Sequence, residues 1–214
     1  MMAFDWFTFS IGLLAQFLFS ARTLVQWVLS ERAKRVVSPS IFWMLGLWGS
    51  FLLSMYGCLR EDFSIVFGQC VLFYVYWWNL KKQGVWEKIP FVVRMVLCSG
   101  SIIFAMLVLC NTPMLTGYFF KNTRLPLWLL FLGTVGQLVF ASRFIVQWIY
   151  SYYIGRSTLP VVFWIISLIG SSMIFLYGML RHDMVLLLGH SFGIVVYIRN
   201  LYIGQFLEVK GRKA

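Results

Sequence analysis

Seven stretches of the chain are apolar over about the length that a helix needs to cross a membrane. A bilayer core about 30 Å thick requires roughly 20 apolar residues in a helix. The seven runs lie at about residues 6–29, 39–59, 63–80, 90–111, 126–150, 159–180 and 184–203. They lack the alternation of strands, and an open sheet cannot sit in lipid with unpaired edges. We therefore predict an all-α integral membrane protein with seven transmembrane helices.

The composition leads to the same class of protein. The 214 residues are 61% apolar and 12% charged, whereas soluble domains are roughly 45–50% apolar and about 25% charged. The first run is too long, and lacks the preceding Lys or Arg, for a cleaved signal peptide, so we expect it to remain as a span. Cys58, Cys70, Cys98 and Cys110 lie inside apolar runs without metal-ligand or redox spacing. We therefore predict no metal, cofactor or disulfide framework.

The net charge of +11 is distributed unevenly along the chain. Lys and Arg concentrate in the gaps between apolar runs, a pattern that orients spans and contacts anionic headgroups, so nucleic acid is not the expected partner. Ten lie on one predicted side: Arg32, Lys34, Arg35, Lys81, Lys82, Lys88, Arg156, Lys210, Arg212 and Lys213. Four lie on the other: Arg60, Lys121, Arg124 and Arg181. This bias predicts an N-terminus outside and a basic cytoplasmic tail over residues 204–214.

The chain also contains an internal repeat. Residues 12–80 align without a gap on residues 133–201, with about 25 identities that include Gln, Arg, Trp, Pro, Asp and Asn. Each copy supplies three helices, and the run at 90–111 between them restores the same orientation. We predict parallel repeats over 6–80 and 126–203 joined by a linker helix. Small transporters use this 3+1+3 arrangement, with a substrate site near midplane between the halves.

Polar residues of the repeats fall on one face of each span at helical periodicity. Our candidate substrate-binding residues are Arg22, Arg143, Gln16, Gln137, Gln26, Gln147, Asn79, Asn200, Trp43, Trp164, Gln69 and His190. A guanidinium inside a span costs at least about 2 kcal/mol unless it is paired or reaches the interface. Its planar fork suits phosphate, and neighbouring glutamines suit sugar hydroxyls. The alternative for the arginines is snorkelling to the inner interface.

Several of these positions have a structural alternative. Small residues such as Gly49 are expected to permit close helix packing rather than to bind a ligand. Pro39 and Pro160 stand where a helix starts or where a gate or hinge bends.

Two further pairs also carry more than one interpretation. Asp62 and Asp183 stand in outer turns, where a carboxylate caps the next helix or serves a gate. Gln69 and His190 occupy equivalent midspan positions, where a hydrogen-bonded core residue is expected more often than a proton carrier.

At these residues the chain resembles the lipid A biosynthesis N-terminal domain family. The resemblance rests on the run from Gln16 through Arg22 and Gln26-Trp27 to Ser30-Glu31, on Pro39-x-x-Phe42-Trp43, and on Tyr197-Ile198-Arg199-Asn200-Leu201. The family shares a superfamily with PQ-loop proteins and SWEET sugar transporters. Members occur fused to lipid-A-disaccharide synthases or as small membrane proteins beside glycosyltransferases. The resemblance implies a SWEET-like fold in the bacterial inner membrane and a role in lipid A or lipid-linked sugar traffic.

The chain departs from the family pattern at three points. Trp78 replaces the Arg that precedes Asn in the first repeat, Tyr152 stands where the first repeat has Glu31, and neither repeat has the Pro-Gln pair of PQ-loop proteins. The synthase's soluble sugar-nucleotide-binding body has no counterpart in these residues. The transport mechanism of PQ-loop proteins is therefore carried over only in outline.

Three functions follow as hypotheses. The first is a transporter or flippase of a glycolipid or lipid-linked sugar, and the second is a non-transporting anchor or accessory domain for a glycosyltransferase. The third is a SWEET-like carrier of free sugars. We do not expect an enzyme, because Ser-His-Asp, Cys-His and metal-ligand constellations are absent from the sequence. The expected partners are membrane lipids, a lipid A precursor and a glycosyltransferase, and the sequence leaves a homo-oligomer open.

Overall fold

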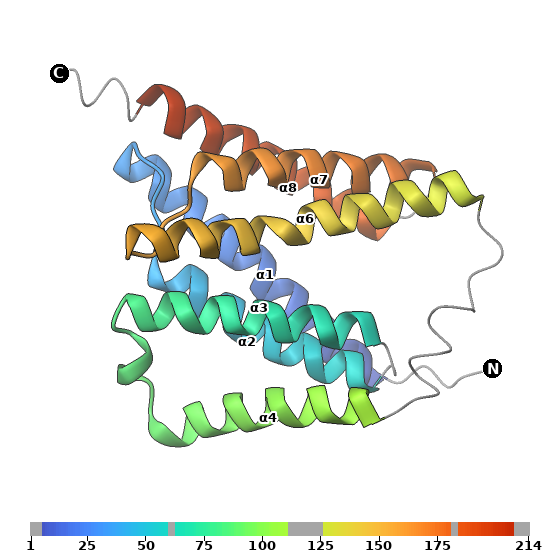
Figure 1. Cartoon of the computed structure of the whole chain (residues 1–214). Coiled ribbons are helices and arrows are strands. Elements are labelled where there is room, and N and C mark those ends of the chain that lie inside the picture. Colours follow the sequence, from blue (N-terminus) through green and yellow to red (C-terminus); the bar gives the residue numbers. More distant parts are fainter. Residues whose placement is uncertain (1–5, 60–62, 111–125, 181–183, 208–214) are drawn as a thin grey trace. The chain divides into compact units, whose positions relative to one another are not determined.

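The computed structural model describes residues 6–59, 63–110, 126–180 and 184–207. This part of the chain forms seven long α-helices and contains no strand. The helices are α1 (Trp6–Ala33), α2 (Ser40–Leu59), α3 (Phe63–Lys82), α4 (Phe91–Cys110), α6 (Leu127–Ile154), α7 (Val161–Leu180) and α8 (Met184–Tyr202) (Figure 1). Two short helical segments, η1 (Trp86–Lys88) and η2 (Ile203–Leu207), follow α3 and α8. The predicted all-helical fold is confirmed.

The helices lie where the apolar runs predict them, to within four residues. Helices α1 and α6 each continue four residues beyond the predicted ends at 29 and 150. Among the described residues, four helices are long and apolar enough to cross a membrane: Trp6–Ala33, Ser40–Leu59, Phe131–Ile154 and Val161–Leu180. The protein is therefore a helical membrane protein. The seven spans and the 3+1+3 order remain predictions.

Repeat-equivalent residues stand at the ends of α1 and α6 and at the starts of α2 and α7. Lys34 and Gly155, which follow α1 and α6 directly, have left-handed φ values of 51° and 77°. A left-handed residue stops a helix, and glycine adopts this conformation without strain. Pro39 and Pro160 come directly before α2 and α7, and the Pro160 carbonyl accepts the Phe163 N–H at 3.0 Å. Both prolines thus stand at helix starts, where a missing N–H costs nothing.

The first of two compact units contains the described residues of Met1–Arg22 and Ser40–Thr123. Helix α2 contacts α3, and α4 contacts both of them. The start of α1 approaches α2 closely at glycines, because a Cβ at Gly49 would lie 2.8 Å from the Phe19 ring. Trp43, Leu47 and Tyr76 are fully buried and form the centre of this unit.

The second unit contains the described residues of Thr23–Pro39 and Arg124–Ala214. Helix α7 contacts α6 and α8, and Phe163, Trp164 and Val196 lie in its core. The last turns of α1 belong to this unit, although sequence repetition assigns all of α1 to the first repeat. Nothing in the apolar pattern indicates this division of α1 after Arg22.

Candidate functional site

Arg22 lies in a cluster of aromatic rings within the first unit. Its side chain is 6% exposed, and its Nη1 donates a hydrogen bond to the Tyr76 hydroxyl at 2.5 Å. The guanidinium carbon lies 4.7, 5.2 and 5.3 Å from the ring centres of Phe19, Phe42 and Tyr76. These rings come from α1, α2 and α3. Gly46 of α2 leaves room for the guanidinium, because a Cβ there would lie 3.0 Å from Nη1.

Arg143 lies in the equivalent cluster of the second unit. Its side chain is 7% exposed, and its Nη1 donates to the Phe140 carbonyl at 3.0 Å. The guanidinium carbon lies 3.2, 4.7 and 5.9 Å from the ring centres of Phe140, Phe144 and Phe163. Phe140 and Phe163 are the repeat equivalents of Phe19 and Phe42. The repeat therefore conserves both the cation and two of its aromatic neighbours.

The two clusters have a common chemistry. Aromatic faces attract a cation through the ring quadrupole, by about 0.5–2 kcal/mol depending on desolvation. The ring faces, the Tyr76 hydroxyl and the Phe140 carbonyl are neutral groups that stabilise a guanidinium. A cation held in this way in an apolar setting is suited to bind an anion such as a phosphate.

The predicted ligands Gln26 and Gln147 form hydrogen bonds within the last turns of their own helices and to the loops that follow. Gln26 and Gln147 are fully buried, and the Nε2 of each donates to Ser30 and Ser151 at 2.9 Å. The same amide of Gln147 donates to the Thr158 carbonyl at 2.8 Å, in the loop that follows α6. These bonds use the side-chain N–H groups of both glutamines, whereas the buried Oε1 of Gln26 has no hydrogen-bond partner among the described residues. That these glutamines bind sugar hydroxyls stays a prediction.

The asparagines are also buried in internal hydrogen bonds. Asn79 and Asn200 donate to the carbonyls of Val75 and Val196 one turn earlier, at 2.8 and 3.0 Å. The Oδ1 of Asn200 accepts the Nε2 of Gln26 at 2.9 Å, which joins α8 to the last turns of α1. The structure thus brings Gln26 and Asn200 together within the second unit.

The predicted tryptophans lie in the core beside the arginine clusters. Trp43 and Trp164 are 0% and 1% exposed, and each meets the preceding phenylalanine edge-on at 4.8 Å. The Trp43 and Trp164 rings also lie 6.2 and 6.1 Å from those of Tyr76 and Tyr197. Among the described residues, no acceptor reaches the buried indole N–H of Trp164.

The midspan pair at 69 and 190 connects neighbouring helices. The Ser50 hydroxyl donates to the Gln69 carbonyl at 2.9 Å, and Ser171 Oγ lies 2.9 Å from His190 Nδ1. The His190 ring meets Phe140 edge-on at 5.0 Å and so lies beside one of the aromatic neighbours of Arg143. His190 is therefore a hydrogen-bonded residue next to the second cluster.

The remaining predicted residues fall into two groups. Gln16 and Gln137 are exposed side chains of α1 and α6. Asp62 and Asp183 lie outside the described residues, so their assignment as caps or gates remains a prediction.

One ion pair explains two departures from the family pattern. Glu31 accepts hydrogen bonds from Nε and Nη2 of Arg199, the second at 3.0 Å, and also accepts the Trp27 indole N–H at 3.1 Å. In the alignment of the repeats, the equivalent residues are Tyr152 and Trp78. The acid and the arginine that binds it are therefore both present at one pair of positions, and both are replaced at the repeat-equivalent pair. Sequence reasoning noted both replacements but not that the retained residues pair.

A model of the family described as the lipid A biosynthesis N-terminal domain matches residues 11–81 and 132–202. These segments coincide with the two copies of the internal repeat. The chain belongs to this family. No solved structure matches the chain significantly.

Family relatives include lipid-A-disaccharide synthases of chlamydiae. The synthase of Chlamydia felis (strain Fe/C-56) is 30% identical over 211 residues, which cover 91% of this chain and 33% of the relative. That of Chlamydia pneumoniae is 28% identical over 199 residues, which cover 90% and 33%. The chain thus spans about a third of the length of the curated relatives it matches. It is a helical membrane protein of a family related to lipid A biosynthesis.

Proposed function

We propose that this family member transports or flips a phosphorylated glycolipid of lipid A biosynthesis, and that Arg22 and Arg143 contact its phosphate. The observation that carries the proposal is the doubled buried arginine. Each copy is at most 7% exposed and lies against three aromatic rings. Intramembrane charges of this kind commonly mark substrate paths.

The donor groups around the second arginine favour an oxygen-rich ligand. Arg143 offers a planar fork of N–H groups, which suits phosphate oxygens in a bidentate geometry. The Trp164 indole N–H is buried and lacks an acceptor among the described residues. A buried donor without an acceptor costs about 1–3 kcal/mol. An oxygen of a bound sugar or phosphate would remove that cost.

The repeat favours movement of the ligand over simple retention. Parallel copies of a three-helix unit, joined by a linker helix, form the SWEET-like 3+1+3 architecture in which small transporters alternate access to a fixed site. We propose this arrangement in the bacterial inner membrane, with the N-terminus outside and the C-terminus cytoplasmic. The charge bias of ten Lys and Arg against four supports that orientation.

Reconstitution into liposomes tests the proposal. Purified protein is expected to move a fluorescent phosphorylated glycolipid between leaflets faster than empty liposomes do. The double variant Arg22→Gln/Arg143→Gln should lose about tenfold or more in rate, because each charge-assisted hydrogen bond contributes about 1.5–3 kcal/mol.

The control variant is Arg94→Gln, which removes an arginine of α4 outside both repeats and should keep the wild-type rate. Melting temperatures in detergent establish that each variant is folded. Wild-type protein that moves no glycolipid contradicts transport. Equal rates for the double variant and Arg94→Gln contradict the role of the two arginines. Movement of unphosphorylated sugars without need for the arginines would instead indicate a free-sugar carrier.

A second candidate function is that of a membrane anchor for a glycosyltransferase. Its supporting observation is that the chain corresponds to about a third of the synthases it resembles. Copurification with a lipid-A-disaccharide synthase is expected under this hypothesis. Full complementation of a deletion strain by an unrelated membrane anchor fused to that synthase would favour anchoring over transport, and failure of that fusion would exclude anchoring as the sole role.

A further inference from the structure

Two loops of the second unit lie side by side and form one surface. We define the basic loop pair as residues 34–39, which follow α1, and residues 155–160, which follow α6. Ser38 Oγ and Ser157 Oγ lie 3.2 Å apart, so the two loops are in contact. Figure 1 shows the ends of α1, α6 and α8 at the same end of this unit.

Hydrogen bonds to buried serine side chains fix the backbone of both loops. The Val37 N–H donates to Ser30 Oγ at 3.2 Å, and the Thr158 N–H donates to Ser151 Oγ at 3.1 Å. The loops are therefore bound to the helices that precede them in the same way. A surface that is ordered before it binds a ligand loses less conformational entropy on binding.

The basic loop pair and the helix end beside it carry four exposed cations. Arg35 and Arg156 occupy repeat-equivalent positions in the loops, and Arg32 and Lys34 lie beside Arg35. Glu31 is the one acidic residue in the described part of this unit, and it is bound to Arg199. The acid that lies nearest in sequence is thus already paired with a cation outside the loops.

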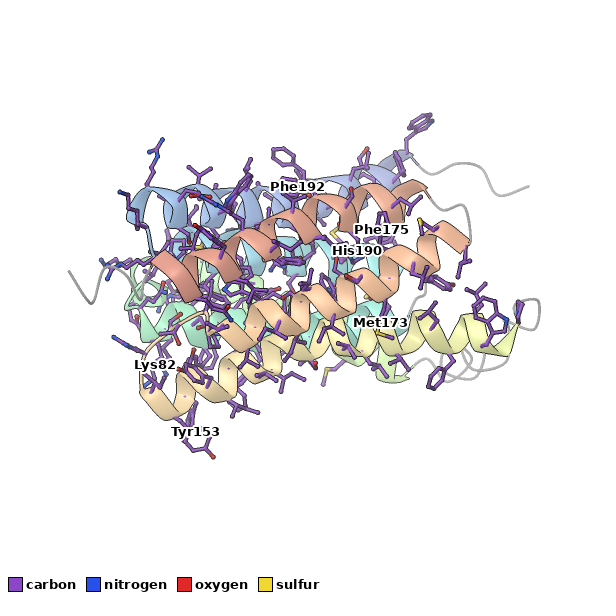
Figure 2. All side chains as sticks on the ribbon, turned by 90° about the horizontal axis from the view of Figure 1, so that it is seen from above. Lys82, Tyr153, Met173, Phe175, His190 and Phe192 are labelled. Atoms are coloured by element: carbon purple, nitrogen blue, oxygen red, sulfur yellow. The ribbon has the colours of Figure 1, made fainter. Side chains whose placement is uncertain are left out.

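Exposed tyrosines border the same surface. Tyr152 and Tyr153, in the last turn of α6, are 61% and 83% exposed. Tyr153 points away from the helices (Figure 2). Tyrosine rings at the end of an apolar helix are typical of the membrane–water interface, where the ring meets acyl chains and the hydroxyl meets headgroups. A membrane boundary at these tyrosines would place the adjacent cations at the level of lipid phosphates.

We infer that the basic loop pair binds the phosphate of an anionic lipid headgroup at the membrane surface. Charge complementarity and the tyrosine border favour a lipid over a soluble acidic protein, since a soluble partner gains nothing from rings at headgroup depth. Arg35 and Arg156 supply one guanidinium from each loop, and the planar fork of a guanidinium suits phosphate oxygens. This site is distinct from the buried arginines and does not depend on transport.

Lipid binding by the purified full chain in a neutral detergent tests the inference. Fluorescent phosphatidic acid is titrated against wild type, against Arg35→Gln/Arg156→Gln, and against Lys81→Gln/Lys82→Gln. The Lys81→Gln/Lys82→Gln variant removes two exposed lysines from the end of α3 and has the same net charge as the Arg35→Gln/Arg156→Gln variant. The loop variant should weaken the apparent Kd about thirtyfold, and the α3 variant should bind within about threefold of wild type.

Three controls separate the outcomes. Phosphatidylcholine and inorganic phosphate should not compete with phosphatidic acid, and Arg35→Lys/Arg156→Lys should recover part of the affinity if the loop variant is folded. Equal weakening in the two charge-matched Gln variants would overturn the inference in favour of bulk charge. Competition by soluble polyglutamate as strong as that by anionic lipid would overturn it in favour of an acidic partner. Loss of glycolipid movement in Arg22→Gln/Arg143→Gln with lipid binding intact would separate this site from the proposed transport site.

Discussion

At the scale of single residues, the repeats place different atoms opposite equivalent glycines. A Cβ at Gly49 would lie 2.8 Å from a carbon of the Phe19 ring. A Cβ at Gly170 would lie 2.6 Å from the backbone nitrogen of Phe140 and 2.8 Å from its Cα. A phenylalanine ring can move within its side-chain rotamers, whereas the backbone of a packed helix cannot give way locally. Small residues therefore serve helix packing here, as predicted from the sequence.

This difference predicts unequal costs for the same substitution. Gly170→Ala should lower the free energy of unfolding in detergent by about 1–3 kcal/mol through overpacking, and Gly49→Ala should cost less because the ring can shift. Gly68→Ala is the control, because among the described residues no atom beyond the backbone of its own helix lies within 4 Å of the added Cβ. It should be neutral or stabilise α3 by up to about 1 kcal/mol through helix propensity. Equal losses at 49 and 170 would show that the backbone contact does not decide the cost.

At the scale of elements, the last turns of α1 are attached to α8. Gln26 bonds Asn200 across 174 residues of sequence, the Trp27 ring lies 6.5 Å from that of Phe192, and Glu31 pairs with Arg199. Apolar periodicity predicts helix positions to within four residues, because it depends on neighbours in sequence. It cannot predict which distant helix packs against the end of another helix. The retained Glu31 and Arg199 were the available signal, since both are absent at their repeat equivalents.

A charge exchange tests this attachment. Arg199→Glu should destabilise the protein because it places two acids together, and Glu31→Arg/Arg199→Glu should recover most of the loss. The side chains of Arg199 and Glu31 are 43% and 31% exposed, so the coupling free energy should be about 0.2–1 kcal/mol. Melting temperatures of the wild type, the single variants Glu31→Arg and Arg199→Glu, and the double variant measure it. The coupling should shrink in 1 M salt, where the Debye length is about 3 Å. Strictly additive effects of the two substitutions would exclude the ion pair.

At the scale of the whole molecule, the sequence predicts which loops lie in the cytoplasm, and the positions of the helices alone do not define this. Ten Lys and Arg lie in one set of gaps and four in the other, and α7 separates Arg156 in the first set from Arg181 in the second. Helix α7 is the most apolar of the four candidate spans. If α7 crosses the membrane, the residues before and after it lie on opposite sides, and the charge bias places Arg156 in the cytoplasm.

Cysteine labelling in spheroplasts tests this topology. In a variant with its four native cysteines replaced by alanine, Arg156→Cys should react with a membrane-impermeant maleimide only after permeabilisation. His182→Cys should react before permeabilisation, because it lies in the gap with fewer cations. The reverse pattern would invert the orientation, so that the basic loop pair would lie outside. Reaction of both cysteines from one side would mean that α7 does not cross the membrane. A three-helix repeat crosses the membrane three times and therefore ends on the side opposite its start. Without a crossing by α7, the second repeat could not do so, and two parallel three-helix repeats would be excluded.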